Sequence, residues 1–199
     1  MLHRLVPSLA GLVLCVGLSA HAAANGAEDF IRQMGDRAVA TVNAPNLGDS
    51  ARARRFGSIF REAFAVPVIG RFVLGQYWRR ATDAERKEYL RVFEAYVVQT
   101  YTDRFSGSSG STFKVGTAKP LNDEEQLVPS EIVRPGGQPP VKVQWRVKHV
   151  PAGYKIVDVI VDGVSMLISQ RDEFASIINR DGGRVAGLIA ALRQRTGQG

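Results

Sequence analysis

The sequence predicts an α+β fold in which helices come first, a mostly antiparallel four-stranded sheet follows, and helices close the chain. Three observations predict this order. Apolar residues recur at helical spacing as far as Phe105, the pattern alternates from Thr112 to Val161, and helical spacing returns after Ser169. Turns containing glycine, proline or asparagine separate the alternating segments.

The first expected helix runs from Glu28 to Val42, and its apolar face consists of Phe30, Ile31, Met34 and Ala38. Pro45 and Gly48 interrupt the helical pattern. Asp49 or Ser50 is expected to cap a second helix, because short polar side chains accept hydrogen bonds from the free amides of a first turn.

A third, short helix is expected to begin at Pro67, since proline fits the first turn of a helix, and to end at Gly75. The longest helix is expected from Thr82 to Phe105. Thr82 and Glu85 have the spacing of a capping box, in which each side chain accepts a hydrogen bond from the other residue's amide.

Strands are expected at Thr112–Ala118, Gln126–Val133, Val141–Val150 and Tyr154–Val161. The third strand alternates most clearly. One of its faces carries Val141, Val143, Trp145 and Val147, and the other carries Lys142, Gln144, Arg146 and Lys148. We therefore expect this strand to be half buried with a basic outer face. Ser169 is expected to cap the next helix, and a last helix follows Gly182 and Gly183.

The N-terminal segment has the pattern of a secretory signal peptide. Arg4 precedes an apolar run from Leu5 to Leu18, and small residues follow as far as Ala24. Roughly 14 apolar residues are too few to span a bilayer core of about 30 Å. We expect residues 1–24 to be removed, after Ala22 or Ala24, and residues 25–199 to form a single exported domain.

Cleavage at either site would remove Cys15, the one cysteine of the chain. Stability must then come from a packed core instead of disulfides. The net charge of +7 favours docking to an anionic membrane surface or an acidic protein, or else a solvated basic surface. Nucleic acid is not expected as a partner, because Trp78 and Trp145 are not interleaved with lysine runs.

Residues for catalysis are scarce. Behind the expected cleavage site, His149 is the one histidine and no cysteine remains, so neither a zinc site nor a cysteine nucleophile is expected. Asp158 and Asp162 are the best acid pair. We expect a structural role, with Asp158 bonded to neighbouring backbone and Asp162 forming a turn with Gly163. A small enzyme using Asp158 or Tyr101 remains the alternative.

Two separated segments stand out, Phe72–Trp78 followed by Ala81 and Thr82, and Tyr154–Ser165 followed by Arg171 and Phe174. Together they resemble the MlaC family of periplasmic lipid carriers. The resemblance implies helices packed over the concave side of a curved, nuclear-transport-factor-2-like sheet. It also implies a non-enzymatic monomer without cofactors, whose cargo occupies an apolar cavity between sheet and helices.

The cavity is implied by the resemblance alone, since apolar residues at these spacings otherwise indicate core packing. The candidate lipid-binding residues are Phe60, Phe64, Ile69, Phe72, Val73, Trp78, Phe93, Val97, Tyr101, Val143, Trp145, Val147, Val159, Val161 and Met166. The candidate docking residues are Arg79, Arg80, Lys142, Arg146 and Lys148. They either dock to acidic partners or head groups, or keep the surface solvated.

The resemblance implies that the carrier moves phospholipid between an outer-membrane lipoprotein complex and the substrate-binding ring of an inner-membrane ABC transporter, which maintains outer-membrane lipid asymmetry. The chain departs from the family pattern at Tyr154, where many members carry tryptophan, and in its turn from Pro135 to Pro140. Relatives associated with hopanoid metabolism share these motifs, so the resemblance also implies a hopanoid as an alternative cargo. A protein adaptor with a solid core and no ligand is a further alternative.

Overall fold

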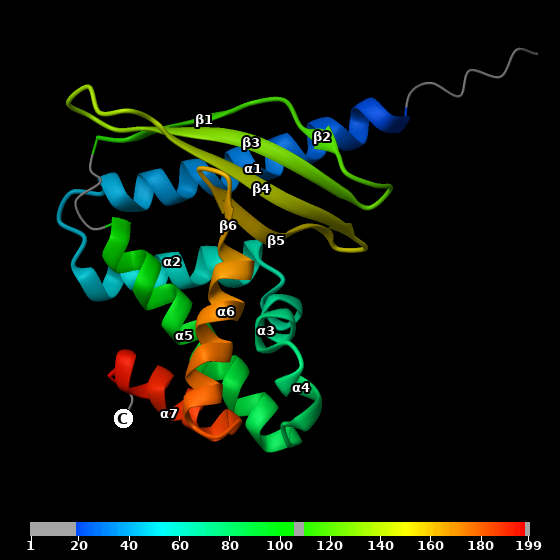
Figure 1. The fold of residues 1–199 in the computed structure, drawn as a ribbon. Coiled ribbons are helices and arrows are strands. Elements are labelled where there is room, and N and C mark those ends of the chain that lie inside the picture. Colours follow the sequence, from blue (N-terminus) through cyan, green and yellow to red (C-terminus); the bar gives the residue numbers. More distant parts are fainter. Residues whose placement is uncertain (1–18, 106–109, 198–199) are drawn as a thin grey trace, which may run out of the picture.

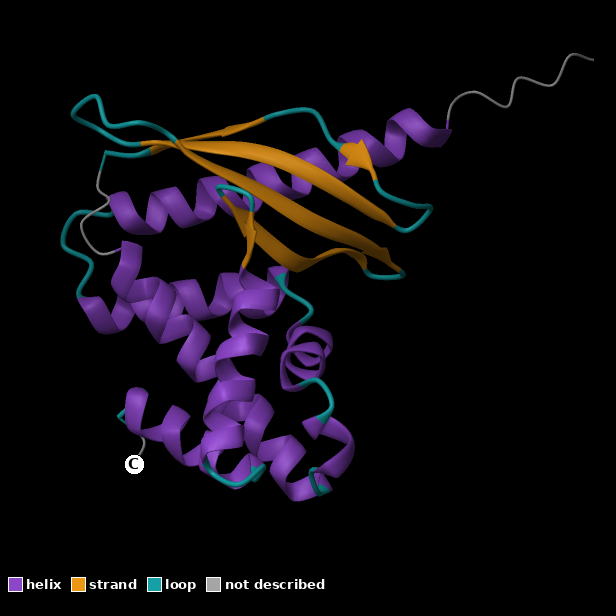
Figure 2. Ribbon diagram, viewed as in Figure 1, coloured by secondary structure: helices purple, strands orange, loops and turns teal. Residues whose placement is uncertain are grey.

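The computed structural model describes residues 19–105 and 110–197. Figure 1 shows a sheet at one end, helices α1 and α2 beside it, and the remaining helices in a bundle at the other end; Figure 2 shows the same division by secondary structure. The helices are α1 (Ser19–Asn43), α2 (Asp49–Ala63), α3 (Val66–Leu74), α4 (Tyr77–Arg80), α5 (Asp83–Phe105), α6 (Met166–Arg180) and α7 (Val185–Arg195). The predicted α+β class is confirmed.

The sheet is antiparallel throughout and has the order β1-β3-β4-β5-β6, with β2 also paired to β3. Its strands are β1 (Thr112–Val115), β2 (Lys119–Pro120), β3 (Glu125–Val133), β4 (Val141–Val150), β5 (Gly153–Val161) and β6 (Val164–Ser165). The four predicted strands correspond to β1, β3, β4 and β5. The expectation of four strands was wrong in number, because β2 and β6, of two residues each, extend the sheet.

Two predicted helix starts are confirmed and two are wrong. Pro67 lies in the first turn of α3. Thr82 and Glu85 form the capping box before α5, with the Thr82 amide donating to Glu85 over 2.8 Å and the Glu85 amide donating to Thr82 over 3.2 Å. Neither Asp49 nor Ser50 caps α2, because Gly48 occupies the N-cap position and Asp49 is already helical.

Ser169 is not the cap of α6, which begins one turn earlier. Ser165 occupies the N-cap, and its hydroxyl accepts a hydrogen bond from the Ile168 amide at 3.1 Å. Ser169 lies inside the helix and donates to the Ser165 carbonyl. Both serines precede an apolar helical pattern, so the sequence does not distinguish them. In the structure Ser165 ends the short strand β6, and α6 begins at the next residue.

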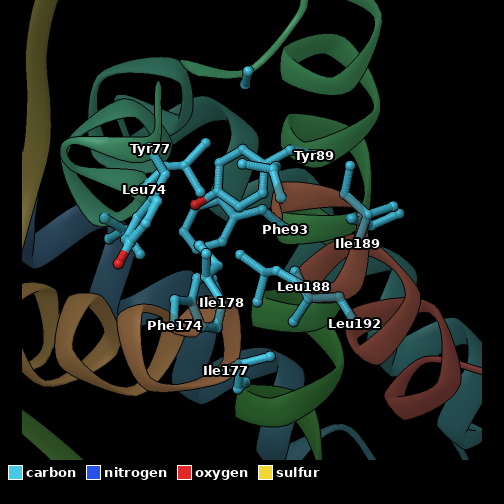
Figure 3. Close-up of a cluster of buried hydrophobic side chains, with 14 of the residues drawn as sticks. Leu74, Tyr77, Tyr89, Phe93, Phe174, Ile177, Ile178, Leu188, Ile189 and Leu192 are labelled. Atoms are coloured by element: carbon cyan, nitrogen blue, oxygen red, sulfur yellow. The ribbon is translucent and has the colours of Figure 1, made fainter. Parts of the chain in front are cut away.

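The buried apolar side chains form two clusters. The helical cluster contains residues of the five helices from α3 through α7, among them Val73, Phe93, Phe174, Leu188 and Leu192. In Figure 3 the ring of Phe174 lies against Phe93, with centroids 6.1 Å apart and planes at 85°, an edge-to-face geometry that favours aromatic pairs. The sheet cluster joins α1 and the end of α2 to the sheet and includes Ile31, Ala63, Val128, Val147 and Ile156.

Two glycines let α1 lie close to the sheet. A Cβ on Gly35 would stand 2.1 Å from a ring carbon of Phe113 on β1, and a Cβ on Gly26 would stand 2.8 Å from the hydroxyl of Tyr154 on β5. Real Cβ atoms do not approach other heavy atoms so closely. The position of α1 over this face therefore depends on these two residues having no side chain.

Candidate functional site

Helix α2 separates the two clusters and contributes to both. Phe60 packs against the helical cluster, Ile59 packs against the sheet cluster, and Phe64 contacts both. The Phe60 and Phe64 rings lie 4.6 Å apart. After α2 the chain touches the sheet edge, where the Ala65 amide donates to the Ile156 carbonyl over 3.0 Å. Phe64 is therefore the side chain at the boundary between the layers.

A groove of about 300 Å³ opens beside this boundary, between α2, α3 and α5. Phe64, Val66, Pro67 and Leu90 give it an apolar wall, and Arg61, Arg91 and Glu94 line it with charge. Arg61 donates to Glu94 over 3.0 Å. A groove with an apolar wall and a charged border suits an amphipathic ligand that has an apolar chain and a polar end.

On the sheet side, four predicted lipid-binding residues lie together. The register pairs Val143 with Val161 and Trp145 with Val159, and directly paired residues in an antiparallel sheet share a face. Trp145 has an edge-to-face contact with Phe113, the ring under α1, at 6.2 Å. These four side chains therefore face the layer of α1 and α2.

A buried hydrogen bond fixes the orientation of Trp145. Its indole nitrogen donates to the Ser130 hydroxyl over 2.8 Å, and that hydroxyl donates to the Val143 carbonyl over 3.3 Å. Ser130 is buried, so the hydrogen bond to its hydroxyl replaces the one that the indole N–H would make with water in the unfolded chain. Sequence analysis did not single out Ser130. The feature of the sequence that could have identified Ser130 is a serine at an inward-facing position of a strand, with apolar residues at the nearest inward positions on either side.

Other predicted lipid-binding residues lie deeper or farther away. Val73, Phe93 and Val97 are buried in the helical cluster, Val147 is buried in the sheet cluster, and Ile69, Trp78 and Tyr101 pack against the helical cluster. Met166 is the half-buried first residue of α6. Trp78 belongs to α4, which Figure 1 places at the end of the bundle away from the sheet. Phe72 is 43% exposed.

The five predicted docking residues divide into three groups. Arg146 is paired with Glu125 at 2.6 Å and Lys148 with Glu124 at 2.8 Å, and the Lys148 ammonium lowers the pKa of the Glu124 carboxyl. Lys142 lines a separate depression of about 450 Å³ on the sheet, near Asp162. Arg79 and Arg80 are exposed on α4 and take part in no ion pair within the described chain.

Asp158 has the structural role expected of it, because hydrogen bonds from neighbouring groups occupy its carboxylate. It is 8% exposed, and its carboxylate accepts hydrogen bonds from the Val159 amide, the Ser165 hydroxyl and the Leu167 amide at 2.7, 2.7 and 3.1 Å. Asp162 adopts a positive φ of 48° in the turn before Gly163. These contacts tie the end of β5 to the start of α6.

Other reactive groupings are not found among the described residues. His149 is exposed on β4 and lies against the Tyr154 ring at 5.0 Å. Within residues 19–105 and 110–197 no group of three or more histidine, cysteine or acidic residues is placed to hold a metal ion. The same residues contain no helix that is long and apolar enough to cross a bilayer.

Comparison with known proteins gives the family. The MlaC protein family model matches residues 32–194. The chain belongs to the MlaC family. Among curated proteins, the MlaC binding protein of the intermembrane phospholipid transport system from Haemophilus influenzae is 24% identical over 132 residues. These residues are 65% of this chain and 61% of that protein, so the chain matches less than two thirds of its relative's length.

The fold of this MlaC family member also matches a solved structure. The phospholipid-binding protein from Ralstonia solanacearum, determined in complex with a phospholipid, superposes with a TM-score of 0.73. The match covers 86% of this chain and 97% of that chain at 21% identity. The two proteins therefore share the arrangement of sheet and helices.

Proposed function

We propose that this protein is a phospholipid carrier whose cargo places its acyl chains between the sheet and the helical bundle. The observation that carries the proposal is the division of the buried side chains into two clusters with Phe64 at the boundary, in a chain of the MlaC family. Of the relatives named above, the Ralstonia protein is a phospholipid-binding protein, and the Haemophilus protein is the binding protein of a phospholipid transport system. The apolar sheet face and the groove beside α2 supply surfaces of the required chemistry.

The free energy of lipid transfer fits a carrier that does no chemistry. Each buried methylene gains about 0.8 kcal/mol relative to water, so two acyl chains of roughly 16 carbons gain on the order of 25 kcal/mol on leaving water. A bilayer offers nearly the same gain. Transfer between bilayer and carrier is then close to neutral, and the direction of transport is set by docking partners.

The size of the groove implies that the two clusters separate when lipid binds. Pockets of about 300 to 1,000 Å³ hold drug-sized ligands, and a two-chain phospholipid is larger than these. The groove of about 300 Å³ accommodates only part of such a cargo. Movement of the sheet layer away from the bundle would open the space that Phe60 and Phe64 fill in this structure.

We further propose that the carrier works in the periplasm after removal of residues 1–24. It would receive and deliver phospholipid at an outer-membrane lipoprotein complex and at the substrate-binding ring of an inner-membrane ABC transporter. Ala27 is fully buried against the sheet cluster, so cleavage after Ala22 or Ala24 keeps this contact of α1. Residues 1–18 lie outside the described residues.

Two neighbouring residues of β5 provide a matched test of the lipid site. Val161 and Ile160 are both half-buried, but successive side chains of a strand point to opposite faces. We expect Val161→Glu to lose co-purifying phospholipid, because it places a charge on the inner face, whereas Ile160→Glu should keep it. Val161 is preferable to its partner Val143, which is only 3% exposed.

The measurement is lipid extraction from both purified variants, with circular dichroism to check that each is folded. Phospholipid retained by folded Val161→Glu at the level of Ile160→Glu would remove the inner sheet face from the site. A hopanoid in the extract would keep the site and change the cargo.

A further inference from the structure

An exposed apolar and basic surface lies on α3, α4 and α6, on a side of the bundle that the proposed lipid site does not use. Val68, Phe72 and Ile168 are 61%, 43% and 55% exposed. Val68 and Phe72 lie one turn apart on α3, and Ile168 lies on α6, which packs against α3. Large apolar side chains gathered on a surface mark an interaction site more often than single ones do.

Four arginines lie on the same three helices, one of them in contact with Phe72. Arg71 neighbours Phe72 on α3, Arg171 stacks over the Phe72 ring at 5.4 Å, and Arg79 and Arg80 follow on α4. The Tyr77 hydroxyl donates to Asn179 over 2.6 Å and so holds α4 beside α6. The three apolar residues and these four arginines are called the α3–α6 surface below; its helices adjoin one another in Figure 1.

The charge of the α3–α6 surface is not neutralised within the described chain. None of its four arginines forms an ion pair there, whereas ten other arginines of the described residues, among them Arg61, Arg86 and Arg193, do. Asp172, the residue after Arg171, is exposed on α6 and sets one negative charge against the four arginines, which leaves an excess of positive charge. The folded protein thus presents guanidinium groups to solvent around apolar side chains.

We propose that the α3–α6 surface docks the protein on an anionic bilayer surface. Basic residues are attracted to anionic head groups, and exposed apolar side chains between them can insert at the head-group boundary. Arginine binds phosphate by two parallel hydrogen bonds, which suits a lipid head group. The inference goes beyond cargo binding, because this surface lies on a different side of α3 from the residues that line the groove.

The test uses exported protein recovered from the periplasmic fraction and sedimented with vesicles. One set of vesicles is phosphatidylcholine alone, and the other is an equimolar mixture with phosphatidylglycerol. We expect binding to the anionic vesicles only, and at least tenfold weaker binding when salt rises from about 0.1 M to about 1 M, since salt screens exposed charges. Sedimentation separates docking from cargo exchange, which leaves protein in the supernatant.

Two variants with the same net charge locate the docking site. The first changes Arg71, Arg79, Arg80 and Arg171 to Gln. The control changes Arg54, Arg55, Lys114 and Lys119, exposed residues of α2, β1 and β2, to Gln. We expect the first to bind anionic vesicles at least tenfold more weakly than wild type, and the control to bind less than threefold more weakly.

Phe72→Ser tests the apolar part of the α3–α6 surface. We expect it to bind anionic vesicles more weakly than wild type, and lowering the salt concentration should not remove the difference, because the lost contribution is apolar. Equal losses in the two four-residue variants would overturn the proposal, because net charge alone would then explain the binding. Equal binding to both kinds of vesicle, or binding to neither, would also overturn it. In the last case an acidic protein is the better occupant.

Discussion

At Gly35, helix α1 crosses the Phe113 ring with no room for a methyl group. We expect Gly35→Ala to destabilise the protein by about 1–3 kcal/mol, because overpacking a filled site costs this much. Alanine is the better helix former by about 1 kcal/mol, so the clash has to exceed that gain. Urea unfolding followed by circular dichroism measures the difference.

Gly57 provides the matched control, since it is also helical. A Cβ there would stand 3.3 Å from the mobile end of Arg61 and 3.5 Å from Val98. Gly57→Ala should therefore be neutral or stabilising by up to about 1 kcal/mol. A Gly35→Ala protein as stable as Gly57→Ala would contradict the close approach of α1 to the sheet.

Glu88 on α5 gives a prediction about pH. Hydrogen bonds from Arg91 and Arg193 lower the pKa of its carboxyl from 4.5 to about 2. A carboxylate whose pKa is lower in the folded state stabilises the fold above its unfolded pKa, and this contribution is lost as the pH falls through the folded value. The advantage of wild type over Glu88→Gln should be constant above about pH 4.5 and shrink toward pH 2.

Thermal unfolding midpoints of wild type and Glu88→Gln across this range measure the effect. Asp123→Asn, which removes an exposed carboxylate from the turn before β3, is the control. A wild-type advantage that is unchanged at pH 2 would show that the arginines do not act on Glu88 in this way.

The start of α6 depends on a side chain of the preceding strand. The two carboxylate oxygens of Asp158 accept hydrogen bonds from different donors, one from the Ser165 hydroxyl and the other from the Leu167 amide. Asparagine has one side-chain oxygen, so its NH₂ group would face one of these two donors. We expect Asp158→Asn to destabilise the protein by about 1–3 kcal/mol, the cost of a buried donor left unsatisfied. Lipid binding should persist in the folded fraction.

Asp162→Asn is the control for this element. Asp162 is exposed, and asparagine also tolerates its positive φ, so the change should stay within about 0.5 kcal/mol. Denaturant unfolding compares the two variants. An Asp158→Asn protein of unchanged stability would return Asp158 to the list of candidate catalytic acids.

The sequence predicted the helices and strands correctly where interactions between residues close in the chain determine their bounds. The Thr82–Glu85 capping box and the alternation of β4 depend on neighbours along the chain, and both were predicted. The starts of α2 and α6 were not, because several polar residues near each start could have served as the cap. The short strands β2 and β6 lack a pattern of their own and form by pairing with β3 and β5.

At the scale of the whole molecule, the sequence indicates which side chains are apolar but not which layer they join. Phe60 on α2 and Phe64, the residue that ends this helix, were both expected at the site. Leu90 and Glu94 were not, since their place in the groove depends on how α5 packs against α2. Phe72 and Trp78 carry the family resemblance, yet Phe72 is 43% exposed on α3 and Trp78 packs against the helical cluster from α4.

The central claim is that the space between sheet and bundle holds phospholipid, and native mass spectrometry tests it most directly. Exported protein is purified without detergent, weighed intact, and weighed again after organic extraction. We predict one stoichiometric adduct with the mass of a glycerophospholipid, which extraction removes. Protein of bare-chain mass that also takes up no labelled phospholipid from vesicles would contradict the account and leave the MlaC fold without its cargo.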